Sequence, residues 1–339
     1  MNEKYMKQAL TLARKGFGKV SPNPCVGAVL VNGGKVVGEG FHKRFGGDHA
    51  EIVAIKDAGS KAKNSILYVT LEPCCHFGKT PPCTEAIKNA GIKEVFVAMK
   101  DPNSKVNGKG IQNLRSAGIK VNLGLLKAEA KNLLQSYLKS FATPLPYIVL
   151  KTACTLDFKI ADKKGKSKWI TSKNSRTFAR KLRADCDAII TGVGTVLKDD
   201  PRMTAKSKPL RIILDSKGRT PLNAKVLKDK NVLLVVTEKA KISKYKDYEV
   251  LNMGKKITIK RLLEKLYKMG IRSVFVEAGN KVSTSFIKAG VVDKFYLFVA
   301  PKLFYDGLDA FDVPLPGFKK MSAVKIGQDT LFESLVNLY

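Results

Sequence analysis

Three residues that commonly bind transition metals, His49, Cys74 and Cys83, lie in separate segments, and they constrain the fold more than any other feature. One imidazole and two thiolates form a typical catalytic zinc site, in which the fourth position is left open for water. Each segment is expected at or just before a helix start, where the positive end of the helix stabilises thiolates. For these residues to bind one ion, the fold must bring the three segments together.

A glutamate accompanies these ligands. Glu51 lies two residues beyond His49, where it can reach a zinc-bound water without binding the metal. The pattern matches the zinc-deaminase signature, in which the metal makes hydroxide near neutral pH and the glutamate moves protons. Eight residues separate the two cysteines where the usual form has two, so Cys75 and His76 compete as possible ligands. A closed structural zinc site and buried cysteines without metal are the alternatives.

The rest of the chain alternates between helical and strand patterns, which favours layered α/β architecture. In the first half, helices are expected at residues 5–15, 50–58 and 84–89, and strands at 27–31, 35–40, 66–71 and 95–99. Two prolines within residues 142–146 predict a linker. Beyond it, strands are expected at 148–152, 188–191, 210–214, 232–236, 273–276 and 294–299, and helices at 173–184 and 258–268. A length of 339 residues favours two domains, and we place them at 1–145 and 146–339.

Composition narrows the class of protein. The formal net charge is +32, but the lysines are scattered, without a long block or an aromatic-interleaved stripe. We interpret the charge as a compositional bias spread over solvated faces. A weak pull on phosphorylated substrates and a nucleic-acid surface are the less favoured alternatives. No apolar run approaches the roughly 20 residues that span a bilayer, and residues 1–12 lack the apolar core of a signal peptide. We therefore expect a cytoplasmic protein, whose three clustered cysteines suggest metal binding before disulfides.

Two motifs resemble one known family. Residues 71–83, Leu-Glu-Pro-Cys-Cys-His-Phe-Gly-Lys-Thr-Pro-Pro-Cys, resemble a loop of the RibD family of bifunctional riboflavin biosynthesis enzymes. Residues 21–27, Ser-Pro-Asn-Pro-Cys-Val-Gly, resemble the N-terminal motif of that family. The resemblance runs over essentially the whole chain. It implies a cytidine-deaminase-like three-layer α/β/α domain followed by a dihydrofolate-reductase-like α/β domain.

The same resemblance implies the reaction. The substrate would be 2,5-diamino-6-ribosylamino-4(3H)-pyrimidinone 5′-phosphate, which zinc hydroxide attacks at the ring carbon bearing the 2-amino group while Glu51 moves protons. NADPH would then reduce the ribosyl group of the deaminated product to ribityl, giving 5-amino-6-ribitylamino-uracil 5′-phosphate. The implied cofactors are Zn²⁺ and NADPH, and the implied partners are small phosphorylated pyrimidines, with neither nucleic acid nor membrane. We also expect a homo-oligomer, for which dimers and tetramers both remain open.

The resemblance also implies site residues. In the first half it assigns the metal to His49, Cys74 and Cys83, catalysis to Glu51, and the substrate to Asn23, His42, His76 and Lys79. In the second half it assigns NADPH to Ala153, Trp169, Thr195, Asp199, Ser216 and Gly279, and the substrate to Ser167, Arg183, Met203, Lys206 and Glu277. The residue types suit these roles, because amides and imidazoles can bind a pyrimidine edge, and lysine or arginine can bind phosphate.

Four positions depart from the family pattern. Phe158 and Tyr305 stand where glycine is usual, Ala278 replaces the first glycine of Glu-Gly-Gly, and Lys206 replaces an arginine. An active deaminase with a degenerate reductase domain is therefore one alternative. A second, a nucleic-acid deaminase with a basic C-terminal domain, predicts a compact Pro-Cys-x-x-Cys spacing that this sequence lacks. A third is a non-enzymatic scaffold stabilised by zinc.

Overall fold

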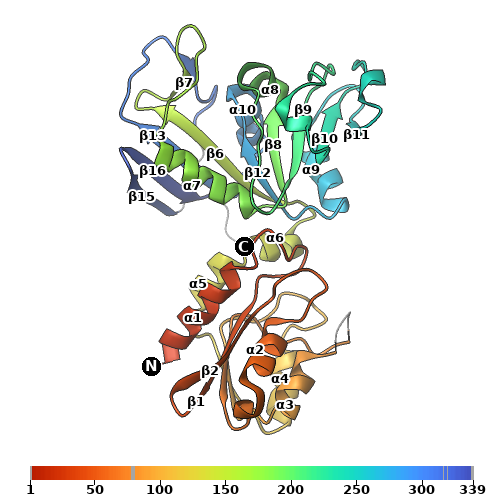
Figure 1. The fold of residues 1–339 in the computed structure, drawn as a ribbon, viewed down its shortest axis with the longest axis vertical. Coiled ribbons are helices and arrows are strands. Elements are labelled where there is room, and N and C mark those ends of the chain that lie inside the picture. The colour runs from red at the N-terminus through yellow and green to blue at the C-terminus, as the bar shows by residue number, and fades with distance from the viewer. Residues whose placement is uncertain (1, 78–80, 316, 319, 337–339) are drawn as a thin grey trace. The chain divides into compact units, whose positions relative to one another are not determined.

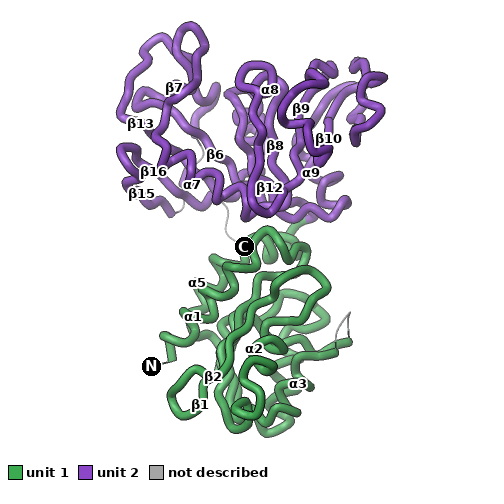
Figure 2. The backbone as a smooth tube through the Cα atoms, viewed as in Figure 1, with its two compact units in different colours: residues 1–143, 339 green, residues 144–338 purple. Residues whose placement is uncertain are grey.

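The computed structural model describes residues 2–77, 81–315, 317–318 and 320–336. The chain divides into two compact units, with the boundary between Thr143 and Pro144 (Figure 2). In the described part of the chain, no helix has the length and hydrophobicity needed to cross a membrane.

The first unit, in which β1 and β2 are labelled in Figure 1, is built on a five-stranded mixed sheet in the order β2-β1-β3-β4-β5. The strands are β1 (Gly27–Asn32), β2 (Lys35–Phe41), β3 (Ile66–Val69), β4 (Glu94–Val97) and β5 (Lys120–Leu123). β1 is antiparallel to both β2 and β3, whereas β3, β4 and β5 are parallel.

Helices cover both faces of this sheet, because successive side chains of a strand point to opposite faces. Val29, Val31 and Tyr68 share one hydrophobic core with α1 (Asn2–Arg14), α5 (Lys127–Leu133) and α6 (Gln135–Ala142). Ala28, Leu30 and Leu67 share another core with α2 (Ala50–Ala58), α3 (Cys83–Asn89) and α4 (Lys109–Ser116). The unit is thus a three-layer α/β/α sandwich.

Helix α2 lies close against β2 because the strand presents glycine at the contact. A Cβ atom at Gly38 would lie 2.3 Å from the carbonyl oxygen of Ala54, and one at Gly40 would lie 2.1 Å from that of Ala50. Both separations are shorter than real contacts allow. The two glycines therefore set the position of α2, whose N-cap residue is His49.

The second unit is built on a nine-stranded sheet in the order β11-β10-β9-β8-β12-β6-β13-β16-β15. The strands are β6 (Tyr147–Thr155), β8 (Ala188–Gly192), β9 (Leu210–Leu214), β10 (Val232–Val236), β11 (Glu249–Asn252), β12 (Ser273–Glu277), β13 (Lys294–Ala300), β15 (Lys320–Ile326) and β16 (Asp329–Leu335). Those from β11 to β13 are parallel, and β16 and β15 add an antiparallel edge. β12 enters between β8 and β6, out of chain order. β7 (Lys159–Ala161) and β14 (Leu308–Asp309) pair separately.

The helices of this unit are α7 (Lys173–Ala184), α8 (Val193–Asp199), α9 (Ile259–Lys268) and α10 (Asn280–Lys288). Helix α7 begins after Ser172, whose hydroxyl accepts the backbone N–H of Ser175, a normal N-cap arrangement. Strands β8 and β10 are buried along their whole length, as expected for parallel strands covered on both faces.

The prediction of two unlike α/β domains is confirmed, and so are the predicted helices and strands, with shifts of a few residues at their ends. The sequence analysis did not predict several further elements. In the first unit these are α4, β5, α5 and α6, and in the second they are β7, α8, β11, α10, β14, β15 and β16. The expected linker corresponds to the segment between the end of α6 at Ala142 and the start of β6 at Tyr147.

Candidate active sites

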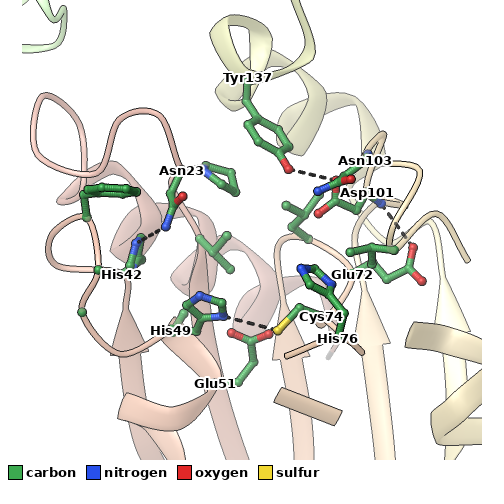
Figure 3. A pocket seen from close by; sticks show the side chains of 18 residues that line it. Asn23, His42, His49, Glu51, Glu72, Cys74, His76, Asp101, Asn103 and Tyr137 are labelled. Carbon is green, nitrogen blue, oxygen red and sulfur yellow. Dashed lines mark hydrogen bonds between the residues drawn. The ribbon is translucent and has the colours of Figure 1, made fainter. Parts of the chain in front are cut away.

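A pocket of about 260 Å³ opens in the first unit where β3 and β4 end (Figure 3). Residues before β1, after β2, after β3 and after β4 all contribute to its lining. This edge is the usual ligand edge of an open α/β sheet. The polar lining residues include Asn23, His42, Glu51, His76 and Asp101.

The three candidate metal ligands converge beside this pocket. The Nδ1 atom of His49 and the Sγ atoms of Cys74 and Cys83 all lie within 4.8 Å of one another. His49 Nδ1 is 3.1 Å from the sulfur of Cys83 and 3.5 Å from that of Cys74. Ligands at ordinary Zn–N and Zn–S bond lengths in a tetrahedral site are separated by about 3.5–3.8 Å. The donor set therefore suits a zinc ion. The distance from His49 to Cys74 matches this spacing, and the distance from His49 to Cys83 is shorter by about 0.4 Å.

The expectation that every ligand segment starts a helix is wrong for Cys74, which follows β3 in irregular backbone. The start of α3 nevertheless contacts Cys74. Cys83 is the first residue of that helix, and its backbone N–H donates to the Cys74 sulfur over 3.4 Å. Hydrogen bonds from the Cys83 thiol and from His49 lower the pKa of Cys74 to about 4, against the opposing effect of burial. Cys74 is thus prepared as a thiolate.

Glu51 lies in the first turn of α2 and is only 3% exposed. Its carboxyl group points toward His49 and Cys74 (Figure 3). Burial raises the pKa of Glu51 to about 7, although the nearby His49 opposes this shift. A carboxyl group with such a pKa can both accept and donate a proton near neutral pH.

Three of the four predicted substrate residues of this unit line the pocket: Asn23, His42 and His76. The side-chain amide of Asn23 donates to His42 Nε2 over 3.1 Å, so Nδ1 of His42 carries the proton and donates to the Asp48 carbonyl over 2.9 Å. Burial lowers the pKa of His42, which keeps this ring neutral. His76 Nδ1 is buried and has no hydrogen-bond partner among the described residues. Lys79 lies outside the described residues.

Among the lining residues that sequence reasoning missed are Asp101, Asn103 and Tyr137. Asp101 and Asn103 follow the strand expected at residues 95–99, so the rule that ligands meet strand ends could have identified them. Tyr137 lies on α6, which was not expected, and its hydroxyl donates to Asp101 Oδ1 over 3.0 Å. No local motif marks it.

In the second unit, Glu277 is the centre of an ion-pair network at the end of β12. Its two carboxylate oxygens accept from Lys151 Nζ over 2.9 Å and from Arg183 Nε over 2.6 Å. Burial alone would raise the pKa of Glu277, but the two cations outweigh burial and hold it at about 2. Lys151 was not predicted; it is adjacent to Glu277 because β6 and β12 pair in register.

Two further contacts connect predicted cofactor and substrate residues. The Ser167 hydroxyl donates to Asp199 Oδ1 over 2.9 Å. Gly279 caps the start of α10 and faces α8, since a Cβ atom there would lie 4.0 Å from Thr195 Oγ1. These contacts bring together the segments that follow β7, β8 and β12.

The remaining predicted residues of the second unit differ in their burial. Ala153 is half-buried on β6, Met203 is buried after α8, Lys206 and Ser216 are exposed, and Trp169 is exposed with its ring 4.1 Å from the Arg176 guanidinium. In the described ranges, no hydrogen bond or ion pair connects these side chains with Glu277, Asp199 or Thr195.

Two of the departures from the family pattern fall on unusual backbone. Phe158 has φ 59° and Tyr305 has φ 50°, in the left-handed region that glycine adopts most readily. Each costs about 1–2 kcal/mol relative to ordinary backbone. At Tyr305 the Asp157 carboxylate offsets part of this cost, because it accepts the backbone N–H groups of Phe304 and Tyr305. Both aromatic rings are substantially exposed.

Comparison with known proteins covers both units. Residues 1–99 match the family model described as "Cytidine and deoxycytidylate deaminase zinc-binding region", and residues 146–332 match "RibD C-terminal domain". Riboflavin biosynthesis protein RibD of Aquifex aeolicus (strain VF5) is 45% identical over 335 residues, covering 96% of this chain and 94% of its own. The RibD protein of Escherichia coli (strain K12) is 38% identical over 343 residues, covering 95% and 93%.

A solved structure is similar over the same length. A diaminohydroxyphosphoribosylaminopyrimidine deaminase/5-amino-6-(5-phosphoribosylamino)uracil reductase from Thermotoga maritima superposes with a TM-score of 0.89 at 39% identity. The match covers 99% of this chain and 98% of that one.

Proposed function

The chain belongs to the RibD family of bifunctional riboflavin biosynthesis proteins. On this basis we propose the reaction that each unit catalyses and the residues that take part in it. The first unit is a zinc-dependent deaminase and the second an NADPH-dependent reductase. The name of the Thermotoga relative describes both reactions, on a diaminopyrimidine ribosyl phosphate and then on its uracil product. The observation that carries the deaminase assignment is the cluster of His49, Cys74 and Cys83 with the buried Glu51 beside it.

We assign Zn²⁺ to His49, Cys74 and Cys83. Bound Zn²⁺ supplies Lewis acidity that activates water for attack on the ring carbon bearing the 2-amino group. Glu51 takes the two protons of the attacking water in turn and delivers one to the ring nitrogen and the other to the departing amino group, so that ammonia leaves and an oxo group remains. The pKa near 7 of this buried carboxyl supports both halves of the transfer.

The substrate ring is assigned to Asn23, His42 and His76. Their position on the pocket wall supports this assignment. His76 Nδ1 has no partner among the described residues and can bind a pyrimidine edge, whereas both ring nitrogens of His42 are hydrogen-bonded, so His42 contributes by orienting the Asn23 amide. We assign the substrate phosphate to Lys79, whose ammonium group can bind it as a point charge.

In the second unit, NADPH supplies the hydride that reduces the ribosyl group of the deaminated product to ribityl. The cofactor residues we propose are Ala153, Trp169, Thr195, Asp199, Ser216 and Gly279. The substrate residues we propose are Ser167, Arg183, Met203, Lys206 and Glu277. The contacts Ser167–Asp199 and Arg183–Glu277 support a common site, since they join residues from separate elements.

We further propose domain limits of 1–145 and 146–339, a cytoplasmic location and a homo-oligomeric state. The cytoplasmic location is supported by six cysteines that are all free thiols, as expected in a reducing compartment. The homo-oligomer is supported by β15, an edge strand on which Met321 and Val324 are 61% and 55% exposed. An exposed apolar edge strand readily pairs with another chain.

The test is an assay of the purified, zinc-loaded protein with the diaminopyrimidine ribosyl phosphate, following ammonia release and NADPH oxidation separately. We expect both signals. Ammonia without NADPH oxidation would support the alternative of a degenerate reductase domain. Absence of both would show that the substrate class is wrong, and tRNA would then be tried as the substrate of a nucleic-acid deaminase.

A further inference from the structure

One wall of the deaminase pocket has no role in the assignments above. It is formed by Asp101 and Asn103, which follow β4, and by Tyr137 on α6 (Figure 3). Asp101 is only 7% exposed, yet no cation forms an ion pair with it among the described residues. Its surroundings must therefore fix its carboxylate through hydrogen bonds.

Those hydrogen bonds occupy one oxygen of Asp101. Oδ1 accepts the hydroxyl of Tyr137 over 3.0 Å and the backbone N–H of Asn103 over 2.8 Å. Two donors fill the two lone pairs of a carboxylate oxygen. Oδ2 is then the oxygen left to accept a donor from a molecule in the pocket.

The backbone around Asp101 is held by a separate set of hydrogen bonds. The buried carboxylate of Glu72 accepts the backbone N–H groups of Asp101 over 3.2 Å, Gly108 over 2.9 Å and Ile111 over 3.1 Å. These bonds fix the segment from β4 to the first turn of α4. The side-chain torsion of Asp101 depends instead on the two groups that donate to its carboxylate. One is the backbone N–H of Asn103, and the other is the side-chain hydroxyl of Tyr137.

Tyr137 is itself held in place. Its ring contacts that of Phe141 edge-on with 5.0 Å between centroids, and α6 packs into the core through Leu138 and its N-cap residue Leu134. Burial and the charge of Asp101 raise the pKa of Tyr137, which keeps the hydroxyl protonated as a donor. In this hydrogen bond Tyr137 is therefore the donor and Asp101 the acceptor.

We propose that Tyr137 is a positioning residue for deamination, which orients Asp101 so that its free oxygen accepts a hydrogen bond from an amino group of the aminopyrimidine substrate. This inference rests on the proposed deaminase function. Tyr137 lies beyond residues 1–99, which match the zinc-binding region. Substrate recognition in the first unit would then depend on α6, the helix that directly precedes the second unit.

The test is steady-state deamination by the full-length, zinc-loaded Tyr137→Phe variant, which keeps the ring and removes only the hydroxyl. We expect KM to rise about 10-fold and kcat to change less than about 2-fold, because the lost bond acts on binding and not on the reacting atoms. Tyr68→Phe is the matched control. It removes a hydroxyl bonded to Asn2 Oδ1 over 2.9 Å in the same unit, outside the pocket, and should retain the wild-type KM.

A double-mutant cycle shows whether Tyr137 acts through Asp101. We expect Asp101→Asn to raise KM, and we expect adding Tyr137→Phe to Asp101→Asn to raise it no further. Full zinc content in each variant shows that the first unit is folded. A Tyr137→Phe KM within about 2-fold of the wild type, or effects that simply add, would overturn the inference. A wild-type enzyme that releases no ammonia would overturn the proposed function, and the inference with it.

Discussion

At the scale of single residues, Glu51 combines deep burial with a position beside three metal-binding side chains. We expect Glu51→Gln to reduce deamination by about 10²- to 10⁴-fold, because the amide keeps the shape but cannot transfer the proton. Zinc content, measured by atomic absorption, should stay at the wild-type level, and so should NADPH oxidation with the deaminated substrate. Ammonia release by the variant at the wild-type rate would show that Glu51 does not transfer the proton.

Glu277 gives a residue-scale prediction about stability. Its pKa in the folded chain, about 2, lies below the usual 4.5, so ionisation of Glu277 stabilises the fold above about pH 4.5 and this contribution is lost as pH falls toward 2. We expect Glu277→Gln to lower the free energy of unfolding at pH 7 by about 3 kcal/mol. The difference from wild type should shrink as pH falls from 4.5.

Urea unfolding followed through the fluorescence of Trp169, the only tryptophan, measures this difference in the second unit. Asp306→Asn is the control, since it breaks an exposed pair with Lys163 that contributes little. A stability difference for Glu277→Gln that does not change between pH 7 and pH 3 would show that its ionisation is not the cause.

At the scale of elements, the distance between α2 and β2 decides where His49 and Glu51 lie. A methyl group at Gly40 would meet the Ala50 carbonyl oxygen at 2.1 Å, so we expect Gly40→Ala to push the start of α2 away from the sheet. Zinc affinity and ammonia release should fall at least about 10-fold, measured by competition with a chelating dye and by the ammonia assay. Val36→Ala changes an exposed side chain of the same strand and should change neither.

At the scale of the whole molecule, each unit has hydrophobic cores of its own. We expect a zinc chelator to abolish ammonia release and to lower the unfolding temperature of the first unit alone, because a bound metal stabilises only the unit that holds it. NADPH oxidation with the deaminated substrate should continue. Calorimetry with and without the chelator measures both transitions, and an equal fall in both would show that the units unfold as one.

Local patterns in the sequence were sufficient for much of this architecture. The apolar run at Val232–Val236 and the amphipathic pattern at Lys173–Ala184 became a fully buried strand and a helix with the expected bounds. Both signals are local, because side-chain periodicity reflects which face of an element is buried. The His49-Ala50-Glu51 motif also placed a candidate ligand and a candidate acid at the start of a helix without any knowledge of the fold.

The contacts between distant segments were decided only by the tertiary structure. The insertion of β12 between β8 and β6 brings Glu277 beside Lys151, 126 positions away along the chain. The packing of α6 brings Tyr137 to Asp101, and the start of α3 brings the Cys83 backbone N–H to Cys74. Strand order and helix packing depend on the joint burial of many side chains, which no local window of sequence contains. The sequence therefore determined the kinds of elements and the candidate chemistry, and the packing determined which groups meet.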